Sequence, residues 1–114
     1  MGRVREYYSL VDDGDIGGLI ELFAPDAVYH RPGYEPMQGR ADLERFYRTQ
    51  RVIREGSHTI TAIIQSGADV AVRGEFRGVL NDGRATSLRF ADFFSLSPDG
   101  RFARRNTFFF APLV

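Results

Sequence analysis

Residues 58–96 read HTITAIIQSGADVAVRGEFRGVLNDGRATSLRFADFFSL, and the spacing of their apolar side chains decides the fold class. Apolar and polar residues alternate along most of this stretch, and β-branched and aromatic side chains are frequent, as in half-buried strands. The pair Asp82-Gly83 is typical of a hairpin turn, and Ser97-Pro98-Asp99-Gly100 predicts another turn. We therefore predict a meander of four long antiparallel strands, at 58–64, 70–80, 86–96 and 101–110.

Residues 1–52 instead repeat their apolar side chains at the spacing of amphipathic helices. Gly14 ends the first helical pattern, Asp15 is a good N-cap for the second, and Pro32-Gly33 forces an irregular loop before the third. The predicted elements are helices at 4–11, from 16 up to Pro25 and at 40–52, and a short strand at 27–31. Helices followed by a meander indicate an α+β fold, with three N-terminal helices on one face of a curved antiparallel sheet. We expect one domain over residues 1–114.

Composition narrows the function classes. Fifteen acidic residues balance fifteen basic ones, all of them arginine, so we expect no nucleic-acid or membrane partner. The absence of cysteine excludes thiolate chemistry and disulfides, and no ligand pattern or phosphate-binding loop suggests a metal or another cofactor. The N-terminus lacks an apolar signal core, which predicts a cytoplasmic protein. Ten Phe and five Tyr suit either an aromatic-lined cavity for a small hydrophobic ligand or an aromatic core.

Several motifs resemble those of one protein family. They are YYSLVDDGDI at 7–16, LFAPDAV at 22–28, Pro32-Gly33, Gly39-Arg40, FYR at 46–48, ADFF at 91–94 and PDGR at 98–101. Their order and spacing are similar to those of ketosteroid isomerase and the SnoaL-like polyketide cyclases of the NTF2-like superfamily. The resemblance spans nearly the whole chain and implies a cone-shaped α+β domain that encloses a pocket. Because this scaffold carries many activities, the resemblance implies the fold more strongly than the function.

The resemblance also implies roles for individual residues. In ketosteroid isomerase an aspartate removes a proton beside a carbonyl, while a tyrosine and a protonated aspartic acid stabilise the enolate oxygen. By motif, Tyr7 matches the tyrosine of this oxyanion hole, Asp92 its acid, and Tyr47 the tyrosine that supports the first. The position of the base, before the proline that ends the first strand, holds Arg31. We therefore expect isomerisation of steroids to be absent or very slow.

Asp92 is the most informative candidate. Strand alternation places it on the same face as Phe90 and Phe94, which should be the core. A lone carboxylate in apolar surroundings is easier to bury protonated, so we expect a neutral acid that faces the same cavity as Tyr7. The alternatives are a bulge that turns Asp92 to water or an ion pair with one of the many arginines, such as Arg73 or Arg105. Either of these would remove its oxyanion-hole role and favour a binding protein.

Three further residues are candidates for the pocket. Arg31 cannot serve as a base, but it can hold a carboxylate, phenolate or enolate; alternatively it is a solvated arginine at a strand end. His30 is adjacent to Arg31, so at most one of the two enters the pocket. His58 starts a strand. Because alternate side chains of a strand lie on the same face, His58 should share the inner face of the sheet with Ile60, Ala62 and Ile64. It is thus the best candidate base, with a core or edge histidine as the alternative.

The later strands carry charged and aromatic residues that could lie in a subunit contact or face the pocket. Arg73, Glu75 and Arg77 alternate along one strand and predict a charged outer stripe or part of a dimer interface. A different register would turn them inward to form a cluster with Asp92. The last strand should contribute aromatic side chains to both the pocket and a contact between subunits, so we expect a homodimer.

The leading hypothesis is a cofactor-independent isomerase or cyclase of bacterial secondary metabolism that acts on a hydrophobic carbonyl or epoxide compound. The rivals are a non-catalytic binding or partner protein and a structural oligomer without a ligand. The candidate catalytic residues are Tyr7, Asp92, His58 and Arg31. The candidate substrate-binding residues are Tyr47, Phe23, Phe90, Phe94, Phe109 and Tyr34.

Overall fold

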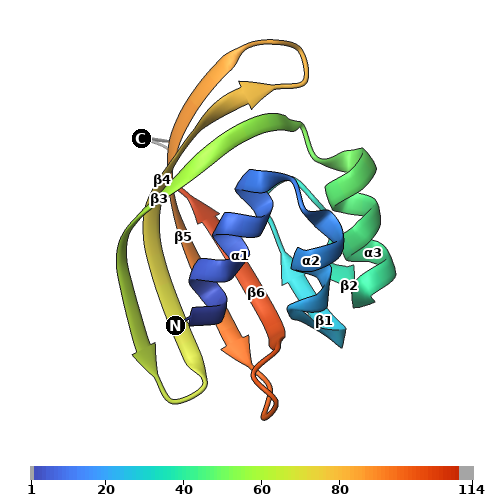
Figure 1. Ribbon diagram of the computed structural model, residues 1–114, viewed down its shortest axis with the longest axis vertical. Helices are drawn as coiled ribbons and strands as arrows, with labels where there is room; N and C mark the ends of the chain where they lie inside the picture. Colours follow the sequence, from blue (N-terminus) through green and yellow to red (C-terminus); the bar gives the residue numbers. More distant parts are fainter. Residues whose placement is uncertain (1, 111–114) are drawn as a thin grey trace.

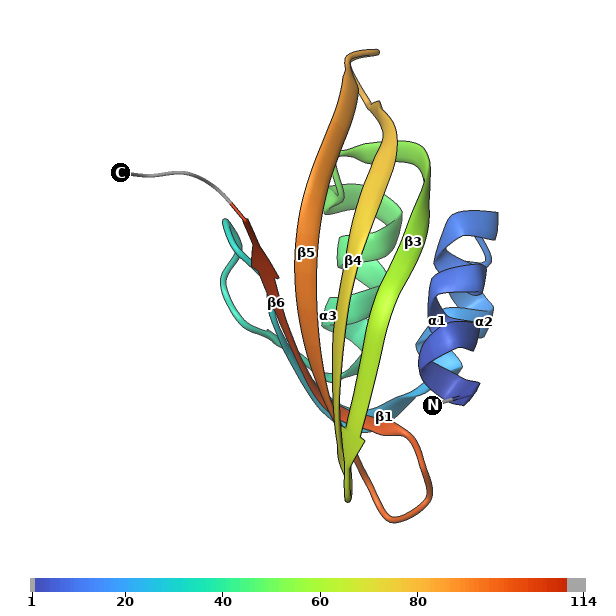
Figure 2. The same cartoon turned by 90° about the vertical axis from the view of Figure 1, so that its left-hand side faces the viewer.

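The computed structural model describes residues 2–110, and within them three helices pack on one face of a curved six-stranded sheet (Figure 1). Seen from the side, α1 and α2 lie together on that face (Figure 2). The strand order is β2-β1-β6-β5-β4-β3. The α+β prediction is thereby confirmed. The elements are α1 (Gly2–Asp13), α2 (Ile16–Glu21), β1 (Phe23–His30), β2 (Met37–Gln38), α3 (Gly39–Arg45), the π-helical turn η1 (Phe46–Gln50), β3 (Ile53–Ser66), β4 (Asp69–Leu80), β5 (Ala85–Leu96) and β6 (Phe102–Phe109).

Helix α1 supplies the layer that closes the inner face of the sheet. It buries Tyr7 and Tyr8 almost completely. Gly14, whose φ of 76° suits glycine, ends the helix as predicted. Asp15 then caps α2, since its Oδ1 accepts a hydrogen bond from the backbone amide of Gly18 at 2.9 Å. Gly14 and Asp15 thus set the ends of the two helices, and α1 carries Tyr7 and Tyr8 into the core.

The second predicted helix is too long. It ends at Glu21, and the chain enters strand β1 at Phe23, before Pro25. Phe23 pairs in parallel with Phe102 of β6, and the register then slips before Val28. Proline has no N–H to donate, so it is tolerated at such an irregularity. The long-range pairing with β6 therefore overrides the helical spacing of the local sequence.

The third predicted helix is two elements. After Arg45 the chain widens into η1, and the amide of Arg51 bonds to the carbonyl of Phe46 at 2.8 Å, one residue further back than in an α-helix. Tyr47, within this wider turn, is buried against the sheet. The turn thus delivers Tyr47, and Arg51 just after it, to the space under the helices.

The predicted meander is confirmed, with one register correction. Strands β3 to β6 pair antiparallel in chain order, but β3 shifts its pairing between Ile60 and Ala62. Beyond this bulge Ile63 packs against the core, while Ile64 is 69% exposed. The expectation that His58 shares its face with Ile64 is therefore wrong. The parity holds from His58 only as far as the bulge.

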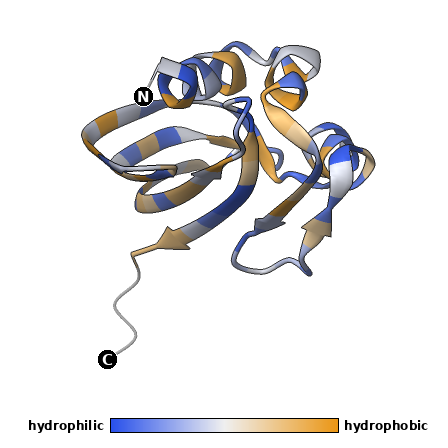
Figure 3. Cartoon of the chain, turned by 90° about the horizontal axis from the view of Figure 1, so that it is seen from below, coloured by the Kyte–Doolittle hydropathy of each residue, from blue (hydrophilic) through white to orange (hydrophobic). Residues whose placement is uncertain are grey.

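The face of the sheet away from the helices carries charged and aromatic side chains. Arg73, Glu75 and Arg77 are exposed there, which agrees with the outer stripe and not with the inward register. Phe93 and Phe108 are also exposed, 47% and 56%, and their rings pack edge to face with centroids 5.7 Å apart. Figure 3 shows hydrophilic and hydrophobic residues following one another along the strands.

Candidate active site

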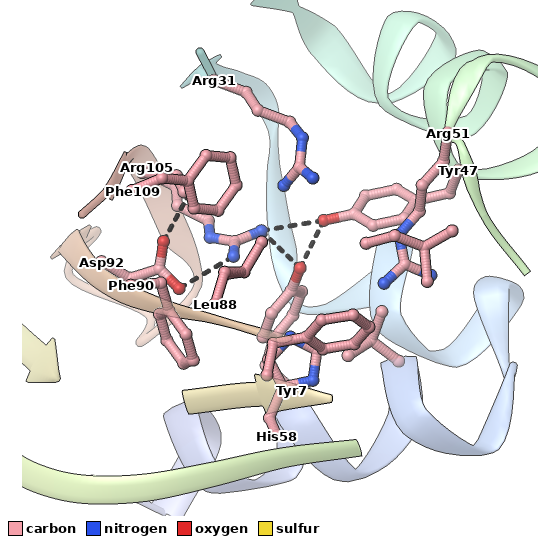
Figure 4. A pocket seen from close by; sticks show the side chains of 14 residues that line it. Tyr7, Arg31, Tyr47, Arg51, His58, Leu88, Phe90, Asp92, Arg105 and Phe109 are labelled. Carbon is pink, nitrogen blue, oxygen red and sulfur yellow. Dashed lines mark hydrogen bonds and ion pairs between the residues drawn. The ribbon is translucent and has the colours of Figure 1, made fainter. Parts of the chain in front are cut away.

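A cavity of about 30 Å³ lies between α1, η1 and the inner face of the sheet (Figure 4). A volume of about 10–15 Å³ holds one water molecule, so this space has the size of a polar head group. Seven of the ten predicted site residues line it: Tyr7, Arg31, Tyr47, His58, Phe90, Asp92 and Phe109.

The other three predicted residues lie elsewhere. Phe23 and Phe94 are fully buried in the core and both pack on Phe102, with ring centroids 5.3 and 4.7 Å from it. Tyr34 packs on Phe46 and lines a separate surface groove. Strand alternation predicts that a side chain lies on the inner face but not whether it reaches the cavity, and Phe94 packs on Phe102 in the filled core.

Asp92 is buried as predicted, but it is not a lone carboxylate. Its Oδ2 accepts a hydrogen bond from Tyr8 and forms an ion pair with Arg105 at 2.9 Å. Its Oδ1 accepts a hydrogen bond from Thr107. Both carboxylate oxygens of Asp92 thus accept hydrogen bonds, and one of them is paired with a guanidinium. The expectation of a carboxylate without a partner is therefore wrong, and with it the role of Asp92 as the hydrogen-bond donor of an oxyanion hole.

Arg105 instead links Asp92 to the two predicted tyrosines. Its Nη1 donates to the hydroxyls of Tyr7 and, at 3.0 Å, Tyr47. The two hydroxyls also share a hydrogen bond with each other. Each hydroxyl has one proton, and their mutual bond uses only one of the two. Within the described residues, one hydroxyl proton remains available to an oxygen atom in the cavity.

The surroundings keep these hydroxyls protonated. Burial raises the pKa of Tyr7 well above its ordinary value, although the charge of Arg105 lowers it, and burial likewise raises the pKa of Tyr47. Burial also raises the pKa of Tyr8, with the Asp92 carboxylate adding to the effect. Burial alone would lower the pKa of Arg105, but Asp92 and the tyrosines raise it above its ordinary value. Arg105 is thus a fixed cation, paired with Asp92, and the neutral hydroxyls beside it are hydrogen-bond donors.

His58 faces this cluster with its ring held by Asp12. Its Nδ1 donates to Asp12 Oδ1 at 2.5 Å, and its backbone amide donates to Asp12 Oδ2 at 2.9 Å. The bond assigns the Nδ1–H tautomer, which leaves the lone pair on Nε2. The imidazole also packs against Phe76 and Phe90, with ring centroids 4.8 and 5.4 Å away. A histidine oriented by a carboxylate in an apolar wall is the arrangement of a general base.

The stability of the fold should report the charge state of His58. Burial lowers the pKa of His58 below 6.5, although the hydrogen bond and charge of Asp12 raise it. The unfolded chain then binds a proton at about pH 6.5 while the folded chain still resists it. Stability is therefore lost as the pH falls from about 6.5 through the folded pKa. Urea unfolding at pH 7.5 and 5.5 should show a larger loss for the native chain than for His58→Gln, and equal losses would contradict the assignment.

Arg31 lines the cavity from the end of β1, while the neighbouring His30 is exposed. This agrees with the expectation that only one of them enters. Arg31 Nη1 donates to the hydroxyl of Tyr29 at 3.2 Å, and that hydroxyl lies 2.9 Å from Thr107 Oγ1. Because Thr107 donates to Asp92, a chain of hydroxyls joins Arg31 to the buried carboxylate.

The structure adds residues that strand parity and the family motifs did not assign to the site. They are Asp12, Arg51, Arg105 and Thr107. The sequence offered one signal for them, since Asp92 on an apolar face needed a partner among the arginines. Choosing Arg105 requires the pairing of β5 with β6, in which Asp92 faces Thr107 and Phe94 faces Arg105.

Residues 2–110 contain neither a cluster of metal ligands nor a helix that could span a membrane. No group of three or more His, Asp or Glu side chains there is arranged to hold a metal ion. None of the helices in this part of the chain has the length and apolar character that crossing a bilayer requires.

Comparison with known proteins gives a family and a fold. The sequence profile of the SnoaL-like domain matches residues 4–105. An NTF2-like protein of unknown function from Burkholderia pseudomallei superposes with a TM-score of 0.87 and 24% identity, covering 96% of this chain and 89% of its own. SalBIII, described as an epoxide hydrolase/cyclase-like enzyme in pyran ring formation in the polyether salinomycin, has a TM-score of 0.84 and 21% identity, covering 96% and 88%. A protein from Catenulispora acidiphila with a ketosteroid isomerase-like fold, in complex with trimethylamine, has a TM-score of 0.82 and 18% identity, covering 93% and 83%.

Proposed function

Because the chain belongs to the SnoaL-like domain family, we propose that it is a cofactor-independent isomerase or cyclase. Its substrate is a hydrophobic carbonyl or epoxide compound, and the chemistry is acid/base catalysis with stabilisation of a developing negative charge. The observation that carries the proposal is the pairing of two functions in one cavity. The Asp12-oriented His58 supplies a base, and the cluster of Arg105, Tyr7 and Tyr47 supplies a cation with a free hydroxyl proton.

For a carbonyl substrate, His58 Nε2 removes a proton from the carbon next to the carbonyl group. The electron pair of the C–H bond moves toward the carbonyl oxygen, which becomes an enolate oxygen. The free hydroxyl proton of the Tyr7–Tyr47 pair bonds to this oxygen, and the Arg105 charge behind the pair stabilises it. The imidazolium then returns its proton to another carbon in an isomerisation. In a cyclisation the enolate carbon attacks a second carbonyl, whose oxygen takes the proton.

For an epoxide substrate the same groups act in a different order. The Tyr7–Tyr47 pair donates a hydrogen bond to the epoxide oxygen, and His58 removes the proton of a hydroxyl group of the substrate. The hydroxyl oxygen forms a bond to an epoxide carbon while the C–O bond of the ring breaks, and the released epoxide oxygen takes the proton back from the imidazolium. SalBIII, described as an epoxide hydrolase/cyclase-like enzyme, has the same fold at 21% identity. This likeness is our reason for placing the reaction in bacterial secondary metabolism.

Exchange of carbon-bound protons with solvent tests the proposal without knowledge of the natural substrate. In deuterium oxide, the protein should speed the loss of the protons next to the carbonyl group of 4-phenyl-2-butanone and 4-phenyl-2-oxobutanoate, followed by proton NMR. Both are apolar carbonyl compounds, and only the second is an acid. If neither compound exchanges faster than in buffer alone, the acid/base proposal fails.

A non-catalytic binding protein is the second candidate, and one observation favours it. Asp92 is held in an ion pair with Arg105 and is not free to act as an acid. A binding protein predicts saturable binding of apolar carbonyl compounds with no proton exchange. The exchange experiment therefore separates the two functions.

We also propose that the chain forms a homodimer through the outer face of the sheet. Phe93 and Phe108 expose about half of their surface there, next to the charged stripe that includes Arg73 and Glu75. Apolar patches of this kind on a sheet face mark contacts between proteins. Light scattering at micromolar concentration should give the mass of a dimer, and Phe93→Glu should shift it to a monomer. A native chain that remains monomeric would contradict this prediction.

A further inference from the structure

Arg31 lies among aromatic rings and has no acidic partner within residues 2–110. Its Cζ lies 5.3 Å from the ring centroid of Phe46 and 5.1 Å from that of Phe109. None of the ion pairs in this part of the chain includes Arg31. Aromatic faces stabilise a guanidinium but leave its in-plane donors unused. The stacking therefore orients Arg31 without supplying a counter-ion.

The free donors of Arg31 lie on one edge. Its Nη1 donates to Tyr29, whereas its buried Nε has no hydrogen-bond partner within the described residues. Nη2 makes no hydrogen bond there either, and covalent geometry puts Nε and Nη2 on the same edge of the guanidinium plane. This edge can hold both oxygens of a carboxylate at once.

The charge of the cavity wall points to the same ligand. Three arginines line it, Arg31, Arg51 and Arg105, and the only carboxylate among its lining residues is Asp92. The wall therefore carries an excess of two positive charges when His58 is neutral. Asp92 already pairs with Arg105, so the charge of Arg31 is left uncompensated. A buried charge without a partner is costly, and an anionic group brought by a ligand removes that cost.

The size of the space fits a head group with the rest of the ligand outside it. The cavity measures about 30 Å³, and a neighbouring groove measures about 360 Å³. The cavity and the groove share four lining residues, Val11, Tyr47, Arg51 and Ile53. A carboxylate at Arg31 can thus be continuous with an apolar body that passes between these side chains into the groove.

We propose that the pocket binds organic acids, with the ligand carboxylate held on the Nε and Nη2 edge of Arg31. The inference deepens the proposed function, because it makes the substrate an apolar carbonyl or epoxide compound that also carries a carboxylate. Arg31 is then the residue that determines specificity for the acid. His58 and the Tyr7–Tyr47 pair, which line the same cavity, act on the carbonyl or epoxide group next to the carboxylate.

Titration calorimetry at pH 7.5 with phenylacetate and its neutral analogue phenylacetamide tests the inference. Phenylacetate should bind saturably, and the amide at least about 30-fold more weakly, as expected when one partner of a buried charge pair is removed. Arg31→Met should weaken phenylacetate by a similar factor and leave the amide unchanged. The matched control is Arg84→Met in the exposed β4–β5 turn, where Arg84 pairs with Asp82; its binding should equal that of the native chain.

A second readout does not depend on the folding of a variant. In the native chain labelled with nitrogen-15, phenylacetate should shift the Nε–H signal of Arg31, while the Nε–H signal of Arg84 stays in place. Three results would each overturn the inference. They are equal binding of acid and amide, an Arg31 signal that phenylacetate does not move, and an Arg31 signal that inorganic phosphate moves but phenylacetate does not. Arg31-dependent binding without proton exchange would refute the proposed catalysis alone. Exchange of the neutral ketone with no preference for the acid would refute this inference alone.

Discussion

Replacing His58 by Gln should lower the rate of solvent exchange into 4-phenyl-2-oxobutanoate by about 100- to 10,000-fold, the usual contribution of a general base. Glutamine can still hydrogen-bond to Asp12 but has no basic nitrogen. Asp12→Asn should lower the rate by less, because Asp12 orients the ring and does not touch the substrate. Proton NMR in deuterium oxide measures both rates.

The chain supplies its own control for this variant. His30, its other histidine, is exposed at the end of β1. His30→Gln should exchange at the native rate. A His58→Gln protein that remains folded and exchanges at the native rate would show that another group is the base.

Replacing Asp92 by Asn should destabilise the fold by about 3–5 kcal/mol, as expected when a buried ion pair loses one partner. The substitution leaves Arg105, only 4% exposed, without its counter-ion. Sequence alone predicts a mild effect, since a neutral acid and an amide are alike as donors. The ion pair reverses that expectation. Urea unfolding of the native chain and of Asp92→Asn measures the difference in the free energy of unfolding.

A double-mutant cycle separates the ion pair from simple loss of packing. Adding Arg105→Met to Asp92→Asn removes the unpaired charge, so the two effects should be non-additive by more than about 1 kcal/mol. The exposed pair of Glu44 and Arg48 is the comparison; Glu44→Gln should cost less than about 1 kcal/mol. Additive effects at Asp92 and Arg105 would mean that their contact is not an effective ion pair.

The sequence predicted the fold where local patterns and the final pairing agree. The alternation of 86–96 places Phe90, Asp92 and Phe94 on the inner face, and the structure buries all three. It failed where distant pairing overrides local spacing. Phe23 fits the helical spacing that runs up to Pro25 but belongs to β1, because β6 offers a parallel partner.

The sequence predicted which site residues lie on the inner face of the sheet, but not which residues they bond to. Parity turned His58 inward, yet its orienting group, Asp12, lies on a helix 46 residues earlier. Parity also buried Asp92, while its counter-ion depends on the register between β5 and β6. A carboxylate on an apolar strand face shows that a partner is required. Only the three-dimensional structure shows that Arg105 is this partner.

The pH dependence of the exchange rate tests the central claim most directly, because it reports the group that takes the proton. Burial lowers the pKa of His58 below 6.5, so the base is neutral and active above that pKa. The rate of exchange into 4-phenyl-2-oxobutanoate should rise with pH to a plateau, with its midpoint below pH 6.5, and His58→Gln should abolish this rise. A profile that is flat from pH 4.5 to 8, or one that keeps the same midpoint in His58→Gln, would contradict the account.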